Sequence, residues 1–139
     1  MARKVAAPTG SIVKGYIETA TIVAVEIEDQ IAEALGSDLS TLEKRMALVG
    51  SIAPAIAKLS YFVRETADLC EDGPIEEQAN RVASAMDQTR EFYVLAIRAE
   101  NSAQFARHYG QMLISISGLR SELQKLEKAR FENSRMRRG

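Results

Sequence analysis

Apolar side chains recur along the last third of the chain at alternating gaps of four and three residues. Seven positions keep this spacing: Phe105, Tyr109, Met112, Ile116, Leu119, Leu123 and Leu126. An apolar residue every 3.5 positions places all seven on one line of an α-helix, as in the seam between two packed helices. The pattern therefore predicts a helix over 102–130 that packs against a partner helix along its whole length.

The same spacing occurs in three earlier segments, which supply the partners for that helix. They are predicted as helices over 11–35, 40–71 and 74–100. The second of them is expected to kink near 50–54, because Gly50 and Pro54 lie close together there. Its first turns are expected to face inward with Leu42, Met46 and Val49.

Capping and turn residues mark the boundaries between these helices. Ser40 and Glu43 have the spacing of a capping box at the start of the second helix. Residues 72–74 (DGP) place a proline at the start of the third. The break at 101–102 (NS) is weaker, so 75–130 is either two helices or one helix of unusual length.

Together these patterns predict an all-α fold. We expect three or four long antiparallel helices in a hairpin or bundle with coiled-coil-like seams. At 139 residues the chain has the length of one domain, which we place at 11–130. Residues 1–10 are expected to form a flexible basic arm, and 131–139 a basic tail without periodicity.

The helix over 102–130 carries a second face, made of small and apolar residues off the seam. Each of its glycines is unfavourable in a helix interior by about 1 kcal/mol relative to alanine, so their presence needs an explanation. One explanation is that this face packs against a second neighbour, such as another copy of the chain. The alternative is that it is a solvated face of small residues. The expected interface residues between copies are Ala106, Gly110, Leu113, Ile114, Ser117 and Gly118.

Charge is unevenly distributed, although the net charge is only −1. Residues 1–14 carry three basic residues and no acid, and 120–139 carry seven basic residues against three glutamates. Basic ends on an acidic body indicate contact with another copy of the body or with a polyanion.

Groups for catalysis or metal binding are few. His108 and Cys70 are the sole histidine and cysteine, and phosphate-binding glycine loops are missing. We therefore expect no enzyme activity, no catalytic or metal-binding residues and no cofactor. No apolar run approaches the ~20 residues of a membrane span, and the first residues lack the apolar core of a signal peptide. The expected location is cytoplasmic, without a membrane contact.

One stretch of the chain resembles the helix-turn-helix of bacterial repressors. The match over 31–46 is carried by Ile31-Ala32, Leu35-Gly36, Asp38, Thr41-Leu42 and Lys44. It implies that Gly36 makes the turn and that a recognition helix offers Thr41, Lys44 and Arg45 to the major groove of DNA. Ser37 and Arg45 depart from the motif, which has aliphatic residues at both positions. The alternative is an ordinary helix end at Gly36 followed by a capping box.

The order of a helix-turn-helix, long helical hairpins and a basic tail is similar in layout to the small subunits of bacteriophage terminases. Those are non-enzymatic ring oligomers that recognise viral DNA and hand it to a motor subunit. The resemblance implies double-stranded DNA as a partner, the host cytoplasm as the location, and contacts from Thr41, Lys44, Arg45, Arg135, Arg137 and Arg138. The alternative is a helical scaffold that binds a partner protein and has no nucleic-acid role.

Overall fold

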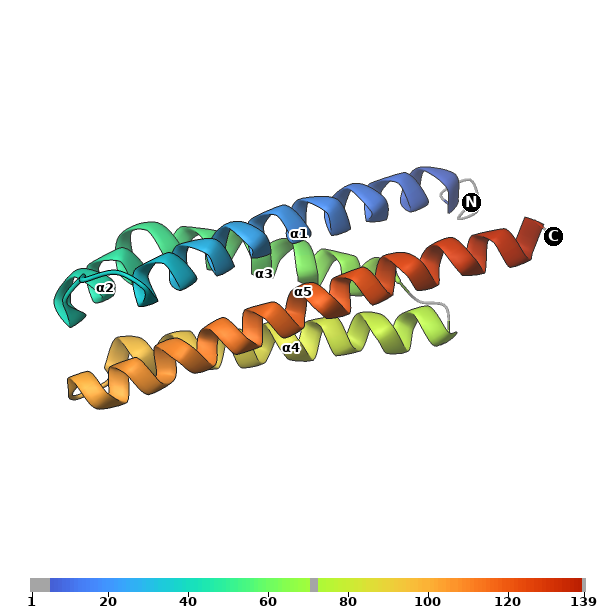
Figure 1. Ribbon diagram of the computed structural model, residues 1–139. Helices are drawn as coiled ribbons and strands as arrows, with labels where there is room; N and C mark the ends of the chain where they lie inside the picture. Colours follow the sequence, from blue (N-terminus) through green and yellow to red (C-terminus); the bar gives the residue numbers. More distant parts are fainter. Residues whose placement is uncertain (1–5, 71–72, 139) are drawn as a thin grey trace.

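The computed structural model describes residues 6–70 and 73–138, with side chains described for 10–70 and 73–132. All elements in this part of the chain are helical, which confirms the all-α prediction (Figure 1). In chain order they are α1 (Ala6–Leu35), α2 (Thr41–Ala47), the π-helical η2 (Leu48–Ile52), α3 (Ala53–Leu69), α4 (Gly73–Arg98) and α5 (Ser102–Arg138).

Four long helices result, because α2, η2 and α3 run without a break from Thr41 to Leu69. Each long helix packs against two others: α1 against α3 and α5, and α4 against α3 and α5. Figure 1 shows the chain reversing direction from each long helix to the next, with the start of α1 and the end of α5 at the same end of the bundle. The apolar seams meet along the axis between the four helices.

The seams predicted from the sequence form this core. All seven seam residues of α5 are at most 1% exposed, from Phe105 to Leu126. The seam of α1, which runs from Val13 to Ala34, is buried as well. A residue every 3.5 positions stays on the inner side of a helix whatever its neighbours are, so this part of the prediction needed only the spacing.

The prediction for the first turns of this helix, in α2 and η2, is wrong, because Leu42, Met46 and Val49 point outward and are 66%, 64% and 62% exposed. The cause is the π-helical turn, in which the N–H of Ala53 donates to the carbonyl of Leu48, five residues back. A π-turn inserts one residue into the α-helical pattern and rotates the preceding helix by about 100°. The inward positions before Ile52 are therefore shifted by one residue, to Leu48, Arg45 and Thr41.

Pro54 gives the physical reason for the π-turn. Proline has no N–H to donate to the carbonyl of Gly50, four residues earlier, and its ring clashes with that carbonyl in a regular α-helix. The wider turn relieves this clash. The Tyr93 hydroxyl also donates to the Leu48 carbonyl, at 3.3 Å, which anchors the π-turn to α4.

The two ends of the chain differ from the prediction. Helix α1 begins at Ala6 rather than residue 11, so 6–10 are not an arm, and residues 1–5 lie outside the described part. Pro8 is compatible with this start, because backbone N–H groups in the first helical turn have no partner within the helix. Helix α5 continues to Arg138 rather than ending at 130. Residues 131–138 contain no proline or glycine that would end it. The Arg130 side chain donates to the Gly10 carbonyl at 2.9 Å and ties the two ends together.

The break at 101–102 separates two helices. Asn101 caps α5, because its side-chain oxygen accepts the N–H of Gln104 at 2.9 Å. The Gln104 side chain in turn accepts the N–H of Glu100 at 3.0 Å. These reciprocal bonds settle the question left open by the sequence, and 75–130 is not one helix.

Candidate functional site: two interaction surfaces

Arg45, a predicted DNA-contacting residue, is engaged inside the chain. Its guanidinium donates to the carbonyls of Ile97 at 3.2 Å and Ala99 at 2.5 Å, at the end of α4. It also lies over the ring of Phe105, 5.3 Å from the centroid. A cation at a helix C-terminus complements the helix dipole, and the aromatic face adds a cation–π contact. Arg45 therefore fastens α2 to the turn between α4 and α5.

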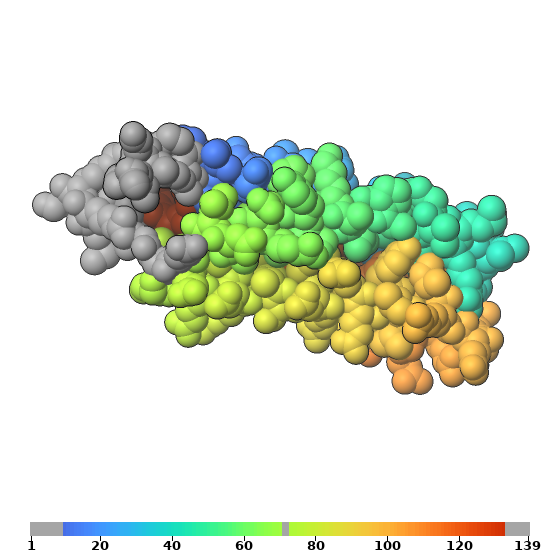
Figure 2. Space-filling model, turned by 180° about the vertical axis from the view of Figure 1, so that it is seen from behind, coloured from blue at the N-terminus to red at the C-terminus, as the bar shows by residue number. Residues whose placement is uncertain are grey.

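Thr41 lies at the same contact, where its hydroxyl donates to the Ser102 hydroxyl at 3.1 Å. Lys44 is half-buried and makes no ion pair with any residue the structure describes. The other predicted DNA contacts, at 135, 137 and 138, lie on the α5 backbone at the opposite end of the molecule, and their side chains are outside the described set. The predicted DNA-contacting residues are thus not gathered on one surface. In Figure 2, α2 lies beside the α4–α5 turn, and α3 and α4 lie side by side along this face.

The π-turn leaves an apolar surface on the outside of the same helix. We call Leu42, Met46 and Val49 the outer stripe; they follow one another at helical spacing and are each more than 60% exposed. Exposed apolar patches of this kind mark contacts with proteins or membranes. The sequence pattern revealed these residues but assigned them to the core.

The helix that carries the outer stripe is unusually apolar. Between Arg45 and Arg64 its one charged residue is Lys58. By length and composition alone, Thr41–Leu69 could cross a membrane, which differs from the expectation that no such stretch exists. In its most apolar window 28% of the residues are buried in the chain. Much of the apolar surface of this helix is therefore not buried in the core of the chain.

The second surface is a groove of about 800 Å³ between α4 and α5, which we call the α4–α5 groove. Its lining residues are Arg81, Ser84, Ala85, Asp87, Gln88 and Glu91 of α4, and Ile114, Ser115, Gly118 and Glu122 of α5. Its walls are held together by a buried bond between the hydroxyls of Thr89 and Ser115, 2.8 Å long. The Gln78 side chain also donates to the backbone carbonyl and the carboxylate of Glu122, at 3.1 and 2.7 Å.

The predicted interface residues of α5 fall on both sides of that helix. Ile114, which is 74% exposed, and Gly118 line the α4–α5 groove, while Ala106 is exposed and Gly110 half-buried. Leu113 packs against the core. Ser117 faces α1, where its hydroxyl donates to Glu28. The structure therefore separates Ile114 and Gly118 from Leu113 and Ser117.

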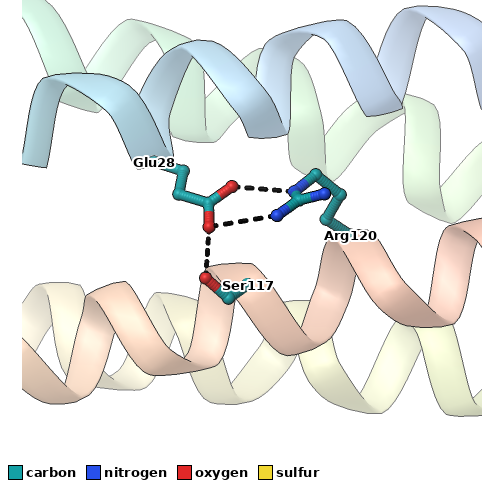
Figure 3. Close-up of polar contacts among 3 residues, drawn as sticks. All are labelled: Glu28, Ser117 and Arg120. Carbon is teal, nitrogen blue, oxygen red and sulfur yellow. Dashed lines mark hydrogen bonds and ion pairs between the residues drawn. The ribbon is translucent and has the colours of Figure 1, made fainter. Parts of the chain in front are cut away.

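Glu28 of α1 joins Ser117 and Arg120 of α5 in a polar cluster between the two helices (Figure 3). The Arg120 guanidinium donates to both carboxylate oxygens, at 2.7 and 3.3 Å, and the Glu28 side chain is 18% exposed. The Arg120 hydrogen bond holds the pKa of Glu28 below its ordinary value, against the opposing effect of burial, and Ser117 adds to the lowering. Glu28 in turn raises the pKa of Arg120. The two residues are 92 positions apart, and this pairing was not predicted from the sequence.

A smaller cleft of about 380 Å³ lies at the contact of α1, α2 and η2 with α5. It is lined by Gln30, Glu33, Ala34, Ser37, Leu39, Ala47, Ile52 and Tyr109. The Tyr109 hydroxyl is buried and has no hydrogen-bond partner among the described residues. Burial raises the pKa of this phenol. Within 10–70 and 73–132, no group of three or more His, Cys, Asp or Glu side chains has the geometry of a metal site.

Comparisons with known proteins gave no match. No family model matches the chain, and neither a curated protein nor a solved structure matches it. The likeness in layout to terminase small subunits therefore stays a prediction, and the functional argument rests on the surfaces described above.

Proposed function

We propose that this chain is a non-enzymatic helical adaptor that self-associates and binds a partner protein through the outer stripe. In this proposal the four helices act as a rigid antiparallel bundle with coiled-coil-like seams. The observation that carries it is the exposure of Leu42, Met46 and Val49, on a helix whose Arg45 and Thr41 contact the turn between α4 and α5. Exposed large apolar side chains at i, i+4 and i+7 are the pattern by which one helix binds another.

The length of the stripe favours a helix of a partner protein over a lipid bilayer. Leu42 and Val49 are seven residues apart, which is about 10 Å along a helix. The hydrocarbon core of a bilayer is about 30 Å thick. Glu43 follows Leu42 directly and is exposed, so a charge lies beside the stripe. Two turns with a charge beside them fit a short amphipathic helix laid across the stripe.

The test is a triple variant, Leu42→Gln, Met46→Gln and Val49→Gln. Because these side chains are exposed, each change should alter the free energy of unfolding by no more than about 0.5 kcal/mol. Proteins captured by the wild-type chain are purified and titrated against the triple variant and against the control Ile22→Gln, which alters a 58% exposed residue of α1. We expect binding to be lost in the triple variant and kept in the control. Equal binding by all three proteins would exclude the outer stripe.

Double-stranded DNA is the second candidate partner, as the terminase resemblance implies. The continuation of α5 to Arg138 supports it, because the basic residues of 120–138 then follow one helix. Lys125 and Lys128 are exposed on this helix. The internal contacts of Arg45 and Thr41 argue against the recognition-helix surface, and leave Lys44 as its one predicted contact that is not hydrogen-bonded to another part of the chain.

Fluorescence anisotropy with labelled duplex DNA at several salt concentrations tests this candidate. If DNA binds, the logarithm of the affinity falls linearly with the logarithm of salt, with a slope of about 0.9 per phosphate contacted. A full-length chain with Arg135, Arg137 and Arg138 changed to Gln should show a smaller slope, and Lys44→Ala tests the remaining surface. Absence of binding at low salt would leave the protein-binding adaptor as the function.

A further inference from the structure

The α4–α5 groove has a projection and a depression on the same line of α5. Ile114 is 74% exposed, more than any other large apolar side chain that the structure describes. One helical turn later, Gly118 has no side chain, and nothing lies within 4 Å of the position that a Cβ would take. Two copies of α5 can pack antiparallel so that residue 116, midway between Ile114 and Gly118, lies opposite residue 116 of the other copy. Ile114 of each copy then lies over Gly118 of the other.

The register between α4 and α5 extends this match to α4. The Thr89–Ser115 contact places residue 116, the midpoint of the Ile114–Gly118 pair, level with residue 88 of α4, and the Gln78–Glu122 contact places it level with residue 84. Met86 lies midway between these two levels. A two-fold axis across both helices at this level would also pack α4 antiparallel on α4 of a second copy. Residues equally far before and after Met86 then face each other.

Two of the α4 charges that line the groove, Arg81 and Glu91, are complementary under this same axis. Arg81 and Glu91 lie five residues before and after Met86, line the α4–α5 groove and are exposed. Each therefore faces the other residue type in the second copy, which gives two equivalent ion pairs. Ser84 and Gln88 face each other in the same way. Within its own chain Arg81 has a 3.6 Å contact with Glu77 on the solvent side, and Glu91 makes no salt bridge with a described residue.

At the ends of the α5 pair, Arg107 would face Lys125 of the second copy. Glu122 lies one turn from Lys125 and contacts it at 3.8 Å, so the two like charges have an acidic group beside them. The footprint is adequate when the contact extends beyond the groove over the whole of α4, which is about 39 Å long; two helices side by side are about 20 Å wide, and the face then measures about 800 Å². Stable interfaces bury about 800 Å² on each partner.

We propose that the α4–α5 groove binds the same groove of a second copy of this chain about a two-fold axis, with Ile114 over Gly118 and Arg81 against Glu91. Such a contact is isologous, so every interaction occurs twice. The inference rests on the self-association in the proposed function and adds its geometry. It does not use the outer stripe, which remains available in the dimer.

Charge reversal in a concentration series of sedimentation experiments tests the pairing. Arg81→Glu and Glu91→Arg should each weaken dimerisation about 30-fold, equivalent to about 2 kcal/mol, since two ion pairs become two like-charge contacts. A mixture of the two variants should dimerise as well as the wild type, because only the mixed dimer places opposite charges at both contacts. Arg90→Glu, on α4 but outside the groove, is the matched control and should leave the dimer unchanged.

Gly118→Leu tests the shape of the contact independently. Nothing surrounds the position of a Cβ at Gly118 within the chain, so the variant should fold with an unchanged circular dichroism spectrum and should not dimerise. If Arg81→Glu, Glu91→Arg and Gly118→Leu all associate as well as the wild type, this interface is wrong, although self-association still occurs. A wild type that stays monomeric throughout the series would overturn both.

Discussion

Replacement of Tyr109 by Phe should stabilise this protein. Tyr109 is fully buried in the α5 seam and stacks on Phe105, with 5.1 Å between ring centroids. Its hydroxyl is shielded from solvent and has no hydrogen-bond partner among the described residues. Tyr109→Phe removes this hydroxyl and keeps the ring, so the packing of the seam is retained without a large cavity.

The expected gain follows from the desolvation of the hydroxyl. Burial of a hydroxyl without a compensating hydrogen bond is unfavourable by about 1–3 kcal/mol in protein mutational data. The free energy of unfolding of Tyr109→Phe should rise by about that amount. Tyr93→Phe is the matched control, because the Tyr93 hydroxyl donates to the Leu48 carbonyl at 3.3 Å. Loss of that bond should lower the free energy by about 0.5–1 kcal/mol, since the bond is long.

Urea denaturation at one fixed protein concentration measures both variants, and thermal unfolding provides a second reading. A gain of 1 kcal/mol should raise the midpoint temperature by about 3–5 °C for a chain of this size. The reasoning fails if Tyr109→Phe is destabilised as much as Tyr93→Phe. The Tyr109 hydroxyl would then have a hydrogen-bond partner in solution. That partner would be a molecule in the cleft that Tyr109 lines with Gln30 and Glu33.

Three further variants test other contacts. The pKa of Glu28 is lowered from 4.5, so its ion pair with Arg120 stabilises the fold above that pH, and this stabilisation is lost as the pH falls through the lowered pKa. Glu28→Gln should remove this part of the acid dependence of the free energy of unfolding, measured by urea titration. Arg45→Ala should lower the free energy of unfolding by about 1–2 kcal/mol, and Arg45→Lys should not restore it, because lysine lacks the guanidinium plane. Gly110→Ala should raise the free energy by up to about 1 kcal/mol in thermal melts, whereas a fall would indicate close packing at Gly110.

The core was predictable because it depends on spacing alone. A heptad line such as that from Phe105 to Leu126 stays on one side of a helix over its whole length, and burial follows once a partner helix is present. The capping box at Ser40 and Glu43 was equally local, and both of its hydrogen bonds form, at 3.1 and 2.9 Å. Neither feature needs information from distant parts of the chain.

The ends and the polar contacts between helices were harder to predict. Arg120 pairs with Glu28 across 92 positions, and Arg130 reaches Gly10 across 120. Such pairs depend on how two helices are aligned along and around their axes, which the spacing of apolar residues on one helix does not specify. The small residues of α5 showed the same limit, because the sequence placed Ile114 and Ser117 on one face while the structure assigns them to different neighbours.

The largest error has a single local cause with functional consequences. The pair Gly50 and Pro54 predicted a kink, but a kink does not say whether a residue is inserted into the helical pattern. The π-turn inserts one and rotates α2 by about 100°, which moves Arg45 inward and Met46 outward. In a regular α-helix the same sequence would bury its apolar stripe and present basic residues to solvent, as a recognition helix requires. The proline therefore favours an exposed apolar surface over an exposed basic one on this helix.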